Sequence, residues 1–154
     1  MSTASQLPEL KLKAIGFVRN GINRGSARQK WEDVISEIVI NPDLQDALDN
    51  LDEFSHIIVI FWTQRKSADL LPHKLHVKHN PDLPLVGLFA TRSPDRPNPL
   101  AKTTVRLLGR QGNVLRVQGL DAFNDTIVID IKPYLPDYDS AEGAKVPGWI
   151  KISP

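Results

Sequence analysis

Seven short β-rich runs divide this chain, and their spacing limits the possible folds more than any other feature. Each run holds six to eight residues and is rich in Val, Ile, Leu or Thr; they cover 11–18, 34–40, 55–62, 84–90, 102–108, 114–119 and 126–131. Many short strands separated by turn signals are typical of closed or nearly closed barrels. We therefore expect a mainly β protein, a small seven-stranded β-barrel with one or two short helices.

One helix is predicted between the second and third runs. Asn41 is a good N-cap, and Pro42 suits the first helical position. Leu44, Leu48 and Leu51 then recur at the spacing of one helical face. We expect this helix to cover one opening of the barrel.

Side-chain parity predicts which residues meet in two of the strands. Along 102–108, Lys102, Thr104 and Arg106 share one face, and the alternate residues share the other. The sequence GRQGN at 109–113 predicts the hairpin turn that joins this strand to the next, because its glycines allow positive φ.

The last run and the third run carry different patterns. Along 126–132, alternation predicts one apolar face and one polar face; the apolar face has Ile127, Ile129 and Ile131, and the polar face has Thr126, Asp130 and Lys132. The run 55–62 is apolar on both faces, which indicates a covered strand or a subunit interface. In a chain this short we favour the interface and expect a homodimer.

Composition narrows the class of protein. The 154 residues contain no cysteine, which excludes disulfides, thiolate catalysis and cysteine-ligated metals. No apolar run is long enough to span a membrane, and residues 1–8 lack the features of a signal peptide, so we expect a cytoplasmic protein. We divide the chain into a flexible segment (1–10), one barrel domain (11–138) and a tail (139–154).

Charge is distributed unevenly along the chain. Residues 92–116 hold six basic residues against one aspartate, a net +5, and residues 121–142 hold six acidic residues against one lysine, a net −5. Opposed segments of this kind can pair across a two-fold axis, and the basic one suits phosphates.

The loop at 87–101, GLFATRSPDRPNPLA, is unusually stiff. Its three prolines at 94, 97 and 99 fix φ and exclude helix and ladder pairing, so its shape is set before any ligand arrives. Arg92, Arg96 and Asn98 then suit a ligand held in one pose. The alternative is a proline-rich connection with solvated arginines.

Three motifs resemble the TsaA-like family: VGLFATRSPDRPNPLAKTTVRLLG at 86–109, FSHIIVIFW at 54–62 and DIKPYLP at 130–136. The similarity runs from about Ala14 to about Tyr138. It implies a small dimeric barrel that binds S-adenosylmethionine outside a Rossmann fold, in agreement with the lack of a GxGxxG motif here. It also implies N6-methylation of threonylcarbamoyladenosine beside the tRNA anticodon.

The resemblance further implies the residues that line the cofactor. The family's Pro-Arg-Gln stretch, the pair after its apolar strand, the arginine of ATR, a usually hydrophobic position and the Asp-Gly-Thr-Pro turn carry over, in that order, to Ala27, Arg28, Gln29, Gln64, Arg65, Arg92, Lys102, Asn124, Asp125, Thr126 and Ile127. In the turn only Thr126 is kept, and Asp125 replaces the most permissive residue. We expect the cofactor to bind, with contacts altered at this turn.

Methyl transfer to an exocyclic amine depends mainly on positioning, which can contribute about 7 to 11 kcal/mol, whereas a general base typically gives ~10² to 10⁴-fold. The candidate catalytic residues are Asp130, Tyr134 and Asn98. For Asp130 the alternative is a structural ion pair with Lys132.

The remaining candidates concern partners. The predicted tRNA phosphate contacts are Arg96, Arg106, Arg110 and Arg116. His73, His76 and His79 lie within seven residues, but their segment has no carboxylate ligand, so we predict a hydrated loop and no metal site.

Two other functions stay open: a barrel that binds S-adenosylmethionine without acting on tRNA, and a methyltransferase for a small molecule.

Overall fold

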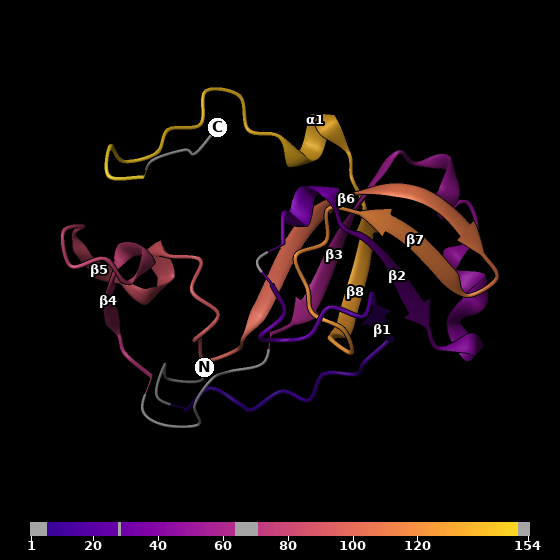
Figure 1. Ribbon diagram of the computed structural model, residues 1–154, viewed down its shortest axis with the longest axis horizontal. Helices are drawn as coiled ribbons and strands as arrows, with labels where there is room; N and C mark the ends of the chain where they lie inside the picture. Colours follow the sequence, from indigo (N-terminus) through magenta and orange to yellow (C-terminus); the bar gives the residue numbers. More distant parts are fainter. Residues whose placement is uncertain (1–5, 28, 64–70, 151–154) are drawn as a thin grey trace.

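Six strands of the chain close into an antiparallel barrel (Figure 1). The computed structural model describes residues 6–27, 29–63 and 71–150. Around the barrel the strand order is β1 (Gly16–Arg19), β2 (Ile35–Ile40), β7 (Val114–Gln118), β6 (Leu100–Gln111), β3 (His56–Trp62) and β8 (Ile127–Pro133), and β8 pairs with β1. The prediction of a mainly β barrel is confirmed, with six strands in its wall instead of seven.

The run at 84–90 accounts for the missing strand. Its first half, β5 (Leu85–Gly87), pairs with β4 (Lys74–His76) in a separate two-stranded sheet, and its second half is the 3₁₀ turn η6 (Leu88–Ala90). In Figure 1 this small sheet lies beside the barrel and not in its wall. Because β8 pairs with both β1 and β3, the closed barrel leaves no edge for a seventh strand.

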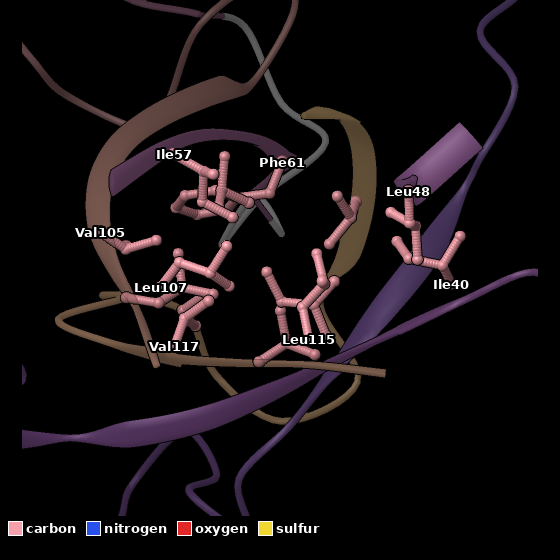
Figure 2. Packing of buried hydrophobic residues seen from close by; sticks show 14 residues of the cluster. Ile40, Leu48, Ile57, Phe61, Val105, Leu107, Leu115 and Val117 are labelled. Atoms are coloured by element: carbon pink, nitrogen blue, oxygen red, sulfur yellow. The ribbon is translucent and has the colours of Figure 1, made fainter. Parts of the chain in front are cut away.

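Aliphatic side chains fill the barrel interior (Figure 2). The residues that are almost completely buried include Val18, Ile38, Ile57, Val59, Val105, Leu115, Val117 and Val128. Burial of each such side chain stabilises the fold by about 1.5 to 3 kcal/mol before entropy is counted. One core therefore supports the whole barrel.

The predicted helix forms as two 3₁₀ turns, η3 (Pro42–Leu48) and η4 (Leu51–Glu53). The N-cap is confirmed, because the Asn41 side chain accepts a hydrogen bond from Asp43 N at 3.1 Å. The helix does not continue because Asn50 adopts a left-handed conformation with φ 64°. Leu48 still reaches the core beside Ile40, so η3 covers one end of the barrel (Figure 2).

The face prediction for β6 is confirmed and that for β8 is wrong. On β6, Val105 and Leu107 are buried and Lys102 and Arg106 are exposed. The hairpin turn between β6 and β7 is also where the sequence predicts it.

The error on β8 comes from a β-bulge. In the pairing with β3, Ile60 faces Asp130 and Phe61 faces Val128, so Ile129 is the extra residue. The bulge reverses the alternation. Thr126 and Val128 are buried, Ile127 is exposed, and Asp130 and Lys132 lie on the other side of the bulge as a polar pair.

The remaining elements are short. They are the 3₁₀ turns η2 (Trp31–Asp33) and η5 (Val77–His79) and one helical turn, α1 (Pro136–Asp139). Trp149 and Ile150 line a small cavity of about 90 Å³ together with Val77 and Lys78 of η5 and Leu83, which places the end of the described chain beside η5. Within the described ranges, no helix has the length and apolar character needed to cross a membrane. The division at residues 10 and 138 stays a prediction.

Candidate ligand cavity at one end of the barrel

A cavity of about 1180 Å³ opens at the barrel end opposite η3. Five segments line it: residues 23–24 after β1, residues 61 and 63 at the end of β3, residues 89–96 from η6 into the stiff loop, residues 100–103 at the start of β6, and residues 121–126 before β8. The volume exceeds that of most pockets for small ligands, which hold about 300 to 1,000 Å³. The cavity therefore has room for a nucleoside cofactor and part of a second substrate.

Hydrogen bonds between distant segments fix the wall before β8. Asn124 Oδ1 accepts from Asn20 N at 2.9 Å and from Gly21 N at 3.1 Å. Asn20 Nδ2 in turn donates to Ser36 Oγ at 3.0 Å and to Ala122 O at 2.9 Å. We call these residues the Asn20–Asn124 network; it holds residues 121–126 against the loop after β1.

The turn at Asp125 keeps a conformation that favours glycine. Asp125 has φ 64°, and its N–H donates to Val18 O at 2.8 Å. Aspartate tolerates the left-handed region better than most residues, since its side chain is short and polar. Thr126 follows, buried, with its N–H donating to Phe123 O at 3.2 Å. The turn therefore forms without glycine.

The cavity wall carries charges of both signs. Its basic residues are Arg24, Arg92, Arg96 and Lys102, and its acidic residues are Asp121 and Asp125, which gives a net charge of +2. Thr103 Oγ1 on β6 donates a hydrogen bond to Asp121 Oδ1, which orients that carboxylate. The lining thus suits a ligand that bears anionic groups together with an amine or another cationic group.

The stiff loop is braced internally and anchored to β3. Arg96 Nη1 donates to Thr91 O at 2.8 Å and to Ser93 O at 3.4 Å. Thr63, just after β3, donates to Pro99 O from its N–H at 2.7 Å and from Oγ1 at 3.0 Å. These bonds add to the fixed φ of the prolines, so little entropy remains to be lost when a ligand binds.

Five of the residues proposed for the cofactor line this cavity together: Arg92, Lys102, Asn124, Asp125 and Thr126. Three others do not line it: Ala27 and Gln29 are joined by a local bond from Nε2 to O of 2.8 Å, and Ile127 points outward, 41% exposed. Arg28, Gln64 and Arg65 lie outside the described residues.

The candidate catalytic residues lie apart from the cavity lining. Asp130 Oδ2 is 2.9 Å from Lys132 Nζ, the predicted ion pair, and lies four residues along β8 from Thr126, roughly 13 Å at the rise of a strand. Tyr134 packs edge to face on His56, with ring centroids 6.4 Å apart, at the far end of β8. Asn98 is exposed, and its carbonyl accepts from Leu100 N at 2.7 Å.

The four predicted tRNA-contact arginines differ in their surroundings. Arg96 braces the stiff loop, and Arg110 donates to Gly112 O at 2.9 Å and to Asp49 Oδ1 at 2.9 Å. Arg106 and Arg116 are exposed on the outer wall, and the described residues offer neither a hydrogen bond nor an ion pair to their side chains. These two are therefore the available cations of the set.

The three histidines lie in different segments: His73 before β4, His76 at the end of β4 and His79 in η5. His76 Nδ1 lies 2.7 Å from Leu83 O, and His73 and His79 are exposed. Among the residues that the structure describes, no three His, Cys, Asp or Glu side chains are grouped to hold a metal ion.

Sequence reasoning missed Asp121, Asn20 and Phe89 as cavity residues or supports. Asp121 and Asn20 have no local signal, since each acts through a partner at least 16 residues away. Phe89 did carry a signal, because it stands directly before the stiff loop in the motif at 86–109.

Comparison with known proteins identifies relatives over most of the chain. Residues 20–140 match the family model described as tRNA-methyltransferase O N-terminal domain. A "Probable S-adenosyl-L-methionine-binding protein" of Archaeoglobus fulgidus is 37% identical over 92% of this chain and 38% of its own length. A protein of the same name from Methanothermobacter thermautotrophicus is 39% identical over 86% of this chain and 95% of its own.

Two further relatives carry other names. A mouse "tRNA (adenine(37)-N6)-methyltransferase" is 34% identical over 69% of this chain and 24% of its own. The crystal structure of TrmO from Pseudomonas aeruginosa superposes with a TM-score of 0.73 at 27% identity, over 91% of this chain and 62% of that one. The chain thus spans less than two thirds of several proteins that it resembles.

Proposed function

Because this chain belongs to the family of tRNA-methyltransferase O N-terminal domains, we propose that it is an S-adenosylmethionine-dependent tRNA methyltransferase. We further propose that it acts in the cytoplasm on N6 of threonylcarbamoyladenosine beside the anticodon. The observation that carries the proposal is the convergence of Arg92, Lys102 and residues 124–126, far apart in sequence, on one basic cavity. Relatives named for S-adenosylmethionine binding and for tRNA adenine methylation support it.

The cavity residues fit the chemical groups of S-adenosylmethionine. Arg92 is an exposed cation suited to the cofactor's carboxylate, and the carboxylate of Asp125 suits its ammonium or sulfonium. Apolar side chains such as Ala101 and Phe123 line the same cavity and offer surface for the adenine. When bound, the cofactor supplies an activated methyl group on sulfur.

We assign the chain two tasks in the reaction. The braced loop and the Asn20–Asn124 network orient the ligands, which supplies the large positioning contribution. The acceptor nitrogen gives up a proton as it is methylated, and Asp121 is the carboxylate that a strand hydroxyl holds in the cavity. Asp121 Oδ is therefore the proposed proton acceptor, in place of the distant Asp130.

The test combines transfer and binding. Purified protein, labelled S-adenosylmethionine and total tRNA are mixed, and label in tRNA is expected; label found only in small molecules would contradict the tRNA assignment. By calorimetry, Arg92→Ala should weaken cofactor binding by about 1.5 to 3 kcal/mol, since a charge-assisted bond is lost. Arg19→Ala, on the outer wall in an exposed pair with Glu37, is the matched control and should leave the affinity unchanged.

A second candidate function is S-adenosylmethionine binding without tRNA methylation. The observation that favours it is coverage: this chain spans 95% of a relative named only for binding but 24% of the mouse methyltransferase. Cofactor binding by calorimetry, with no label in tRNA or in small molecules, is the result expected for it.

We also propose that two copies of the chain pair through the outer wall beside the cavity. An apolar row crosses four neighbouring strands there, because Trp62 faces both Leu100 and Ile127, and Ile127 faces Phe17. Leu100, Ile127 and Phe17 are 37 to 41% exposed. Light scattering should report a dimer that Phe17→Glu disrupts; a monomeric wild type at micromolar concentration would refute the pairing.

For tRNA we propose phosphate contacts at Arg106 and Arg116. Both side chains project from the outer wall of the β6–β7 hairpin, where they can follow a nucleic-acid backbone without reading its sequence. Replacing either arginine by alanine should weaken the binding of different tRNAs about equally. It should also lower by roughly one the magnitude of the salt slope, which is the slope of the logarithm of the binding constant against the logarithm of the salt concentration. If the salt slope is unaltered in both variants, neither arginine contacts a tRNA phosphate, and both are solvated residues of the outer wall.

A further inference from the structure

Phe89 stands out among the aromatic residues near the cavity. It is 78% exposed, about twice the exposure of any other phenylalanine in the chain, all five of which are described. It lies on η6, outside the barrel wall, and lines the cavity rim. A single exposed apolar residue is common on protein surfaces, so the contacts of this ring decide what it means.

Arg96 and Phe89 form one rigid unit at that rim. The guanidinium carbon of Arg96 lies 5.6 Å from the Phe89 ring centroid, within the range of a cation–π contact. Arg96 is held in turn by its bonds to the loop carbonyls, and Thr91 ties the loop to η6 through Oγ1 to Leu88 O at 2.7 Å. The ring is thus presented to solvent in a fixed place, which lowers the entropy lost on binding.

A flat π ligand matches this unit better than other ligand classes. Nucleobases stack on aromatic rings regardless of sequence, and a basic lining attracts the phosphates that accompany them. The cavity lining is net positive, which excludes a preference for cationic peptides. Phe89 lies at the rim, whereas the residues assigned to the cofactor lie in the inner lining. Phe89 therefore suits a base of the larger substrate better than the adenine of the cofactor.

We propose that Phe89, backed by Arg96, is the stacking platform for a base of a single-stranded RNA loop that enters the cavity. The inference rests on the proposed tRNA function and adds the form of the substrate. Bases in single-stranded loops can be splayed out and stacked on aromatic side chains, whereas those in a duplex cannot. An anticodon loop meets this requirement.

The experiment compares Phe89→Ala, Phe89→Trp and Leu85→Ala. Leu85 is an exposed apolar residue of the neighbouring strand β5 that does not line the cavity, and so serves as the matched control. Binding of an anticodon stem–loop is measured at several salt concentrations, with calorimetry of S-adenosylmethionine and light scattering alongside. Phe89→Ala should weaken RNA binding about 5- to 150-fold, the loss expected for one stacked base. Phe89→Trp and Leu85→Ala should bind like wild type.

The salt slope and the cofactor affinity separate the outcomes. Because no ion pair is lost, the slope should stay unchanged in Phe89→Ala, unlike in the arginine variants. The platform is overturned if cofactor affinity falls instead of RNA affinity, if Phe89→Trp is as weak as Phe89→Ala, or if the loss accompanies dissociation of a dimer. If Phe89→Ala binds RNA normally while wild type methylates tRNA, the platform fails and the proposed function stands; if wild type neither binds nor methylates RNA, both fail.

Discussion

Replacing Asn20 should destabilise the barrel and loosen the cavity at once. Its side chain makes three hydrogen bonds, to Ser36 Oγ at 3.0 Å, to Ala122 O at 2.9 Å and from Ile22 N at 3.0 Å. At a net value of about 1 kcal/mol for each bond, Asn20→Ala should lower the free energy of unfolding by about 3 kcal/mol. Ser36 is buried and loses the Asn20 amide as a hydrogen-bond donor. The loss of stability should therefore be no smaller than this estimate.

The same variant should also bind S-adenosylmethionine about tenfold more weakly. Without the Asn20 amide, residues 121–126 lose the bond to Ala122 O, while the backbone bonds from Asn20 and Gly21 to Asn124 remain; ordering even one loosened residue on binding costs about 1 to 2 kcal/mol. Asn20→Asp keeps the acceptor for Ile22 N but loses the two donated bonds, so its unfolding free energy should lie between those of wild type and Asn20→Ala.

Urea unfolding and calorimetry check both numbers. The matched control is Asn80→Ala in an exposed turn beside the β4–β5 sheet, where the side chain accepts a hydrogen bond from Asp82 N at 2.9 Å; a surface change of this kind should alter stability by about 0.5 kcal/mol or less. If Asn20→Ala is no less stable than Asn80→Ala, the Asn20–Asn124 network does not hold the cavity wall and the reasoning is refuted.

Three further substitutions test the fold around the cavity. Gly16→Ala should lower the free energy of unfolding by about 1 to 3 kcal/mol in urea, because a Cβ there would overlap Val39 O; an unchanged midpoint would show that β1 and β2 separate easily. Asp125→Gly should raise the free energy of unfolding by up to about 1 kcal/mol, since the left-handed backbone no longer strains a side chain, and should weaken cofactor binding on calorimetry, since the carboxylate proposed for the cofactor's cationic groups is lost; unchanged affinity would mean that this carboxylate does not contact the ligand. Arg110→Ala should lower the melting temperature, because its bond to Asp49 is lost, and should leave the salt slope of tRNA binding unaltered. A reduced slope would show that Arg110 contacts a tRNA phosphate.

The sequence by itself determined the elements that depend on local chemistry. The runs at 34–40, 55–62 and 114–119 became β2, β3 and β7 within about one residue. The Asn41 cap and the hairpin after β6 also formed as predicted. In each case the cause lies in the segment itself, as alternation, a side-chain acceptor two residues away or a glycine in a turn.

The tertiary structure decided where alternation breaks and which run stays outside the barrel. The bulge at Ile129 exists because β8 must pair with β3 on one side and β1 on the other, and no local pattern announces it. The run at 84–90 looks like the other runs, yet the barrel closes without it, so β5 pairs with β4.

The same distinction holds for the cavity residues. The motif at 86–109 and the turn at 124–127 indicated Arg92, Lys102 and Thr126, and the fold brings these residues to one cavity. Asp121 and Asn20 gained their places through partners in other segments of the chain, 18 and 102 residues away. Such hydrogen bonds join groups that only the closed barrel brings together, whereas a sequence pattern reports the conformation of its own segment.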